Sequence, residues 1–352
     1  MDGIYFAGVE GGATHSTLII ANGNGEIVAK VNGDGTNHWM VGIPEVARRI
    51  AAMASEAKQA ANIPDTVKFK CIGLSLSGCE QDTTNAALER EIKKEFPGLS
   101  EGYVVCSDTL GSILTVSNLG GVVVIAGTGS NAFLRNPNGE TFQCGGWGHA
   151  IGDEGGAWWI AFKAVKTIFD DDDNLEKCPY DTTVVWNLVK SHFNIEHRRD
   201  MLEHCYASFQ KSFYARLCQK MSVAASNGDE LCQSIFTDAG RQLAKMISAL
   251  TPKVDKALID AGHLSIICVG SVWLSWELLR KGFIKELNKH KIPFELRLLQ
   301  LKPNVSMAVG AYYMAADSLN FPMPRDYSQN YEIFFNYDGH KLTNGKEYLN
   351  GN

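Results

Sequence analysis

Apolar residues near the start of the chain fall into three short runs separated by turn residues. Each run is rich in β-branched and other apolar side chains, which predicts strands at residues 4–10, 16–22 and 26–31. The first turn reads Gly-Gly-Ala-Thr (11–14), and glycine at such positions costs backbone entropy that an ordinary hairpin avoids. We therefore expect another group to come very close to this backbone.

Strands and helices alternate after this meander. Strands are predicted at 68–76 and 102–107, together with helices over "PEVARRIAAMASEAKQAANI" and "TNAALEREIKKEF", where apolar residues recur at helical spacing. Three strands in a meander followed by alternating helices and strands are typical of a mixed α/β sheet.

The opening pattern returns at residues 120–146, again as strand, Gly/Thr turn, strand, Asn-Gly turn and strand. The Asn-Gly pairs at 24–25 and 138–139 are both strong hairpin signals. The repeat predicts an α/β fold with two duplicated lobes, an N-terminal lobe of residues 1–117 and a C-terminal lobe of residues 118–352.

The rest of the second lobe is expected to contain a helical insertion, since residues 154–262 are predominantly helical in pattern. A strand at 264–270, the strand "PFELRLLQL" and the helix "VSMAVGAYYMAADSL" complete an α/β unit. We interpret the tail from Phe321 as a surface extension and the acidic run at 170–173 as a solvated loop.

Composition narrows the class of protein. The chain has 352 residues, 45% of them hydrophobic, and a net charge of -6, which argues against binding to nucleic acid or to an anionic membrane. No apolar run approaches the length of a membrane span, and the start of the chain lacks the basic segment of a signal peptide. Nine cysteines without a CxxC motif are typical of reduced thiols and predict a cytoplasmic protein, with the nucleus as the alternative compartment.

The two Gly/Thr hairpins suggest a ligand. Backbone N–H groups and hydroxyls without bulky side chains are what a polyphosphate needs. The P-loop motif GxxxxGK[ST] is absent from the sequence. "GTGSNA" (127–132) fits the dinucleotide pattern, but a strand follows it where that motif requires a helix. One such hairpin would usually be a structural turn, whereas a pair at the same place in repeated units favours phosphate binding.

The hairpin residues also resemble a known superfamily. "VEGGATHS" and "IAGTGSN" are similar to the two phosphate loops of the sugar kinases and actin, and "CVGSVW" to their adenosine loop. "GTNHW", "GLSLSG", "CGGWGHAIGDEGGAWWIA" and "VGSVWLSWELL" resemble the eukaryotic N-acetylglucosamine kinases, in the BadF/BadG/BcrA/BcrD-type branch of that superfamily. The match covers nearly the whole chain in order. Glu10 replaces the usual Asp of the first loop, as it does in those kinases.

The resemblance implies a set of ATP and Mg²⁺ contacts. The positions that match the family's nucleotide contacts are Gly12, Thr14, Gly127, Thr128, Gly129, Ala215, Gly270 and Ser271. Mg²⁺ bridges phosphate oxygens, keeps several waters and needs only one or two carboxylates, so Glu10 is the candidate metal ligand.

The resemblance also implies a sugar site. The matching positions are Asn37, Asp108, Gly146, Trp147 and Asp153, and Ser77 at the end of a strand is added as a hydrogen-bonding residue. Two of them have a structural alternative: Asn37 could cap a loop, and Trp147 could be a core aromatic.

Asp108 is the candidate catalytic base. It ends the apolar strand "YVVCSD", at the edge of the sheet where α/β proteins place their ligands. The competing interpretation is a helix N-cap, because "TLGSILTV" starts a helix immediately afterwards.

The implied function is phosphorylation of N-acetyl-D-glucosamine at its 6-hydroxyl by ATP, in two actin-like lobes around a cleft and as a homodimer. N-acetylmannosamine and muramyl peptides are further acceptors implied by the resemblance. Two alternatives from other classes remain: a BadF-type ATPase activator, which needs a cysteine-held iron–sulfur cluster, and a non-catalytic sugar-sensing module.

Overall fold

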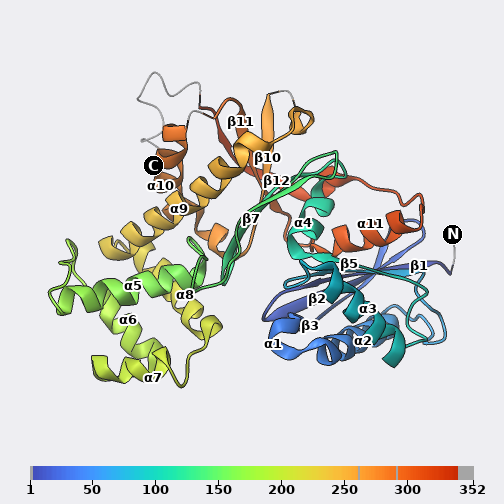
Figure 1. Ribbon diagram of the computed structural model, residues 1–352, viewed down its shortest axis with the longest axis horizontal. Coiled ribbons are helices and arrows are strands. Elements are labelled where there is room, and N and C mark those ends of the chain that lie inside the picture. Colours follow the sequence, from blue (N-terminus) through green and yellow to red (C-terminus); the bar gives the residue numbers. More distant parts are fainter. Residues whose placement is uncertain (1–2, 261, 291, 340–352) are drawn as a thin grey trace. The chain divides into compact units, whose positions relative to one another are not determined.

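The computed structural model describes residues 3–260, 262–290 and 292–339. The chain divides into two compact units (Figure 1). Unit 1 comprises Met1–Gly121 and Leu299–Ile333, and unit 2 comprises Val122–Leu298 and Phe334–Asn352. The chain first passes from unit 1 to unit 2 after Gly121, near the expected lobe boundary at 117/118. The expectation of one continuous segment for each lobe did not include the return of Leu299–Ile333 to unit 1.

Unit 1 is built on a five-stranded mixed sheet in the order β3-β2-β1-β4-β5. Its strands are β1 (Tyr5–Gly11), β2 (His15–Asn22), β3 (Ile27–Asp34), β4 (Cys71–Leu76) and β5 (Tyr103–Ser107). The first three form an antiparallel meander, and β4 and β5 continue the sheet parallel to β1. Its helices are α1 (His38–Val41), α2 (Ile43–Ala60), α3 (Asp82–Glu95), α4 (Asp108–Val116) and α11 (Ala308–Ser318).

Helices cover both faces of this sheet, since neighbouring residues of a strand point to opposite faces. Ala7 and Val9 of β1 join the core under α2 and α3, whereas Phe6 joins the core under α11. Helix α11 approaches the strands closely: a Cβ at Gly8 or Gly73 would lie 2.0 or 1.8 Å from a carbonyl oxygen of that helix. These two glycines allow the C-terminal helix to pack directly on β1 and β4.

Unit 2 repeats the same sheet order. Its strands are β6 (Gly121–Ala126), β7 (Ser130–Arg135), β8 (Thr141–Gly145), β9 (Ile259–Asp260), β10 (His263–Val269), β11 (Glu295–Leu301) and β12 (Tyr331–Tyr337). Read from the far edge, β8-β7-β6-β10-β11 corresponds to β3-β2-β1-β4-β5 in unit 1, with β12 added at the edge. The expected duplicated α/β fold is therefore confirmed.

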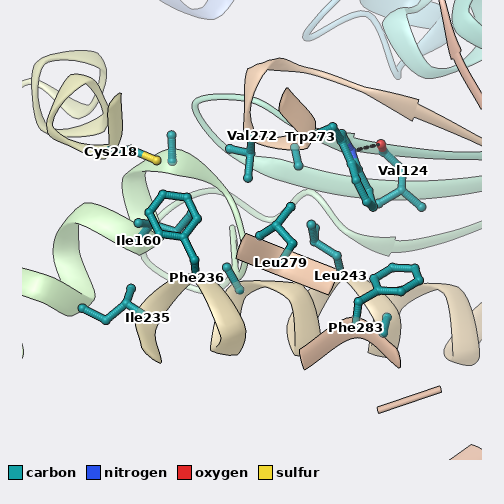
Figure 2. Packing of buried hydrophobic residues seen from close by; sticks show 14 of the residues in the cluster. Val124, Ile160, Cys218, Ile235, Phe236, Leu243, Val272, Trp273, Leu279 and Phe283 are labelled. Carbon is teal, nitrogen blue, oxygen red and sulfur yellow. Dashed lines mark hydrogen bonds between the residues drawn. The ribbon is translucent and has the colours of Figure 1, made fainter. Parts of the chain in front are cut away.

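A helical insertion follows β8. It contains α5 (Ala157–Asp172), α6 (Thr183–Phe193), α7 (Met201–Cys205), α8 (Lys211–Ser226) and α9 (Glu230–Leu250), and α10 (Trp276–His290) comes after β10. Short 3₁₀ turns lie at Arg198–Asp200, Thr251–Lys253, Lys256–Leu258, Ser271–Ser275 and Tyr327–Gln329. Figure 2 shows the core that these helices share with the sheet, where the indole N–H of Trp273 donates to the carbonyl oxygen of Val124 at 3.0 Å.

Two local expectations are corrected. The tail is more than a surface extension, because Tyr331–Tyr337 forms the edge strand β12 and Met323 is buried. The acidic run at 170–173 is the last turn of α5 and its C-cap rather than a loop, and its carboxylates pair with Lys166, Lys177 and Arg198. Among the described residues, no helix is both long and apolar enough to cross a membrane.

Candidate active site

The first glycine-rich turn joins β1 to β2 in unit 1, and backbone hydrogen bonds hold it in place. Gly12 N–H donates to the carbonyl of His15 at 2.9 Å, and the carbonyl of Gly12 accepts from Thr36 N–H at 3.0 Å. Thr14 is exposed, and its carbonyl accepts from Gly35 N–H. A Cβ at Gly12 would meet its nearest protein atom only at 3.5 Å, which is ordinary contact. The packing of the protein therefore leaves room at this turn for a ligand to approach the backbone.

Asn37 and Ser77 lie beside this turn. Ser77 N–H donates to the carbonyl of Gly11 at 2.7 Å, which ties the end of β4 to the end of β1. The Asn37 side chain caps α1 by accepting from Trp39 N–H at 2.9 Å, and its amide N–H lies 3.3 Å from Ser77 Oγ. The capping alternative for Asn37 is thus observed, and the same side chain also reaches Ser77.

Asp108 is the first residue of α4, directly after β5. It is not the helix cap, because the side chain of Ser107 occupies the N-cap position and accepts from Leu110 N–H. The pKa of Asp108 is raised to about 6: burial is the largest cause and the negative charge of Glu80 the second, and backbone N–H groups at the helix start offset part of the rise. A carboxyl group at a strand end whose pKa lies near 6 suits a proton acceptor that works close to neutral pH.

Glu10 supplies a second carboxylate in the same unit. Its Oε2 accepts a hydrogen bond from the buried Ser306 Oγ at 2.8 Å, and its charge contributes to the raised pKa of Asp108. Two neighbouring carboxylates fit the one or two that Mg²⁺ takes when phosphates and waters complete its shell. Among the described residues, no group of three or more His, Cys, Asp or Glu side chains is arranged to hold a metal ion by itself.

The second glycine-rich turn joins β6 to β7 in unit 2. Backbone N–H groups at the start of α5 bind its carbonyls: Ala157 N–H donates to Gly127 O at 2.8 Å and Trp158 N–H to Thr128 O at 3.0 Å. A Cβ at Gly127 would meet nothing within 4 Å, so the protein leaves this position open, as it does Gly12. Gly129 differs, because a Cβ there would lie 2.2 Å from Oδ1 of Asp153.

Asp153 is buried and has a left-handed backbone (φ 67°). Its Oδ1 accepts from Ser130 N–H at 3.0 Å, and its Oδ2 lies 2.6 Å from Lys211 Nζ. Both carboxylate oxygens therefore have protein partners, and the contact of Asp153 with a sugar stays a prediction.

The other nucleotide candidates occupy different places in unit 2. Gly270 (φ 107°) lies against the end of β6, since a Cβ there would come within 2.8 Å of Gly127 N. Ser271 follows at the exposed start of a 3₁₀ turn. Ala215 is buried on α8, with 7% of its surface exposed. The structure thus brings Gly270 next to the second glycine-rich turn.

Gly146 and Trp147 follow β8 in a loop of left-handed glycines. Gly145, Gly146 and Gly148 all have φ near +80°. Trp147 is 66% exposed, so it is not a core aromatic. A glycine-rich loop that presents an indole to solvent offers a surface for the apolar face of a sugar ring.

Sequence reasoning missed three side chains at these loops. Ser306 binds Glu10, Lys211 pairs with Asp153, and Glu80 raises the pKa of Asp108 while accepting a hydrogen bond from Gly78 N–H. Ser306 and Lys211 come from segments that no glycine motif marks, and Glu80 lies two residues after the motif "GLSLSG". Only spatial proximity identifies them.

A family model and several known proteins match most of this chain. The model of the BadF/BadG/BcrA/BcrD ATPase family matches residues 7–315. The chain is 24% identical over 304 residues to an N-acetyl-D-glucosamine kinase of Dictyostelium discoideum, covering 82% of this chain and 89% of the relative. It is 26% identical over 265 residues to a glucosamine kinase of Vibrio cholerae, covering 74% of this chain and 85% of that one. A solved structure described as a proposed N-acetylglucosamine kinase, from Chromobacterium violaceum, shares the fold with a TM-score of 0.69 at 21% identity, covering 89% of this chain and 99% of its own.

Proposed function

Because the chain belongs to the BadF/BadG/BcrA/BcrD ATPase family, we propose that it transfers the γ-phosphoryl group of ATP to the 6-hydroxyl of N-acetyl-D-glucosamine. The names of relatives that span most of the chain, an N-acetylglucosamine kinase and a glucosamine kinase, support an amino sugar as acceptor. The observation that carries the proposal is Asp108: it lies at a strand end, Ser107 performs the capping role in its place, and its pKa is raised to about 6.

The chemical step follows from the position of this carboxyl group. Ionised Asp108 would accept a hydrogen bond from the 6-hydroxyl and orient its oxygen towards the γ-phosphorus. As the new P–O bond forms, Asp108 would take the hydroxyl proton, and the bond from the γ-phosphorus to the β,γ-bridging oxygen would break, so that ADP leaves with that oxygen and its electron pair. Phosphoryl transfer depends mainly on positioning and charge neutralisation, so one base and a firmly held phosphate chain are sufficient. Exclusion of water matters as well, because water is a competing acceptor.

The phosphate chain would be held by the two glycine-rich turns. In the proposed complex, backbone N–H groups and hydroxyls of Gly12, Thr14, Thr128 and Gly129 contact phosphate oxygens, and Gly127 keeps the second turn free of a side chain. Bound Mg²⁺ neutralises charge on the transferred group, and Glu10, oriented by Ser306, is the proposed protein ligand.

The nucleoside and the sugar use the remaining candidates. We propose that Gly270, Ser271 and Ala215 contact the adenosine moiety. The sugar would be bound by Asn37, Ser77, Gly146, Trp147 and Asp153, besides Asp108. The proposal also includes a cytoplasmic location and a homodimer. Gel filtration with light scattering tests the homodimer directly.

The substrate assignment is tested with a coupled assay of ADP release over a panel of sugars. A site built to pair the acetamido group rejects analogues that lack it more strongly than a site that senses size alone. We expect kcat/KM for N-acetylglucosamine to exceed that for glucose by a wide margin, with N-acetylmannosamine and muramyl peptides as weaker acceptors. Equal values for N-acetylglucosamine and glucose would contradict the assignment.

An absorption spectrum distinguishes the proposed kinase from the alternative, an ATPase activator with an iron–sulfur cluster. An iron–sulfur protein absorbs visible light, whereas the proposed kinase is colourless. The cysteines of the described part of the chain are all unpaired thiols, and six of the nine are buried.

A further inference from the structure

Lys211 is a basic side chain that neither a glycine motif nor the proposed chemistry accounts for. It is the first residue of α8, and its Nζ lies 2.6 Å from Oδ2 of Asp153. The Asp153 side chain is only 5% exposed, and that of Lys211 is 31% exposed. Removing Lys211 would leave the charge of the buried Asp153 without its cationic partner, so this ion pair stabilises the position of Asp153 in unit 2.

The carboxylate of Asp153 acts directly on the second phosphate turn. Its Oδ1 accepts the N–H of Ser130, and Gly129 packs against the same oxygen. Ser130 is also held through its hydroxyl, which donates to the carbonyl of Glu154 at 2.8 Å. The direction of the backbone at Gly129 and Ser130 therefore depends on where the carboxylate lies.

The ion pair links this turn to the helix that carries Ala215. Lys211 and Ala215 are four residues apart on α8 and so lie on the same face of the helix. One salt bridge thus fixes two segments that the proposed function assigns to the nucleotide, the turn at 127–129 and the first turns of α8.

We propose that Lys211 is a positioning residue for ATP, acting through Asp153 on the second phosphate turn without touching the nucleotide. This inference rests on the assignment of that turn to the ATP phosphates. Loss of the Lys211 charge would let the carboxylate move, and the Gly129–Ser130 backbone would lose its fixed direction. Sugar recognition by Asn37 and Ser77 in unit 1 would be unaffected.

The test compares Lys211→Met with Lys211→Arg, which keeps the charge, and with Lys220→Met as a matched control on the same helix. Lys220 is exposed. Calorimetry with Mg²⁺ and the non-hydrolysable analogue AMP-PNP, without sugar, measures nucleotide affinity. Small misplacements of binding groups cost up to about a hundredfold, so we expect Lys211→Met to lose roughly ten- to a hundredfold in affinity. Lys211→Arg should recover most of this loss, and Lys220→Met should match the unmodified protein.

A double-variant cycle shows whether Lys211 acts through Asp153. In Asp153→Asn the carboxylate charge is gone, so adding Lys211→Met should weaken AMP-PNP binding no further. Full additivity, or a folded Lys211→Met that binds like Lys220→Met, would overturn the proposal. If Lys211→Met does not fold, Lys211→Arg and the double variant decide the question.

Failure of the proposed function has a different signature. A protein that binds AMP-PNP but phosphorylates no amino sugar contradicts the kinase assignment and leaves the Lys211 comparison measurable. A protein that does not bind AMP-PNP overturns both.

Discussion

The two glycine-rich turns occupy equivalent places in the duplicated sheets, yet different contacts hold them in place. The turn of unit 1 is fixed by backbone hydrogen bonds from Gly35, Thr36 and Ser77. The turn of unit 2 is fixed by backbone N–H groups at the start of α5 and by the buried carboxylate of Asp153, which pairs with Lys211. Duplication conserved the strand order, while the supporting contacts differ because different segments follow each meander.

The surroundings of the turns differ in charge as well. Unit 1 places the carboxylates of Glu10, Glu80 and Asp108 near its turn, and their mutual repulsion contributes to the raised pKa of Asp108. Unit 2 pairs its carboxylate with a lysine. In the proposed mechanism, unit 1 would provide the proton acceptor and unit 2 would mainly hold the phosphate chain.

The largest effect is expected in unit 1. Asp108→Asn keeps the shape of the side chain but cannot accept a proton, and general-base catalysis contributes about 10²–10⁴-fold. We expect kcat to fall by that factor while the KM values for sugar and ATP change little, which marks an interaction lost in the transition state. Steady-state kinetics over both substrates measure this. If kcat fell by no more than about threefold, the loss would be far smaller than the contribution of a general base, and Asp108 would not be the base.

The next largest effect is expected in unit 2, with ATP use as the readout. Gly129→Val places a branched side chain where Oδ1 of Asp153 lies, so the turn must shift. We expect the KM for ATP to rise about ten- to a hundredfold and sugar affinity to fall by a smaller factor, because Asp153 is only one of the proposed sugar contacts. Thermal melting controls for folding.

Gly127→Ala is the matched control for this variant, because its added Cβ meets nothing within 4 Å. Its melting temperature should equal that of the unmodified protein, and any rise in KM for ATP then reports a contact with the nucleotide itself. Unchanged ATP kinetics in a folded Gly129→Val would show that the second turn is misassigned.

A smaller effect is expected at Glu10. Ser306→Ala removes the hydroxyl that orients its carboxylate, and a single lost hydrogen bond to a charged group costs about 1.5–3 kcal/mol when it is fully expressed. We expect a higher Mg²⁺ concentration for half-maximal activity, with the KM for sugar unchanged. Titration of activity with Mg²⁺ measures this, and an unchanged Mg²⁺ requirement would argue against Glu10 as the ligand.

The smallest effect is a pH dependence of stability. The pKa of Asp108 is raised in the folded protein, so ionisation of this group disfavours folding above about pH 6, and the penalty disappears as the pH falls towards 4. Asp108→Asn, which is never ionised, should therefore melt a few degrees higher than the unmodified protein at pH 8 and at the same temperature near pH 4. Melting curves across this range measure the difference. A constant difference would show that burial and the charge of Glu80 do not raise the pKa of Asp108.

Local sequence determined the strands, the hairpins and the duplication. Alternating apolar runs and Asn-Gly turns are read from neighbouring residues, and β1, β2, β6 and β7 lie within a few residues of their predicted places. The position of Asp108 at a strand end is equally local. The tail was mispredicted although Tyr331–Tyr337 (YEIFFNY) is rich in aromatic and β-branched residues that favour strands, because local sequence does not show that this segment pairs with β11 at the edge of a sheet.

Only the tertiary structure decided which polar groups meet. Ser107 and Asp108 are both good capping residues, and in the structure Ser107 is the N-cap. Glu10 and Ser306 are 296 positions apart, and they meet because α11 returns to pack on β1. A buried charge requires a partner, but the sequence does not say which of many lysines provides it. The fold supplies Lys211 by placing the start of α8 against Asp153.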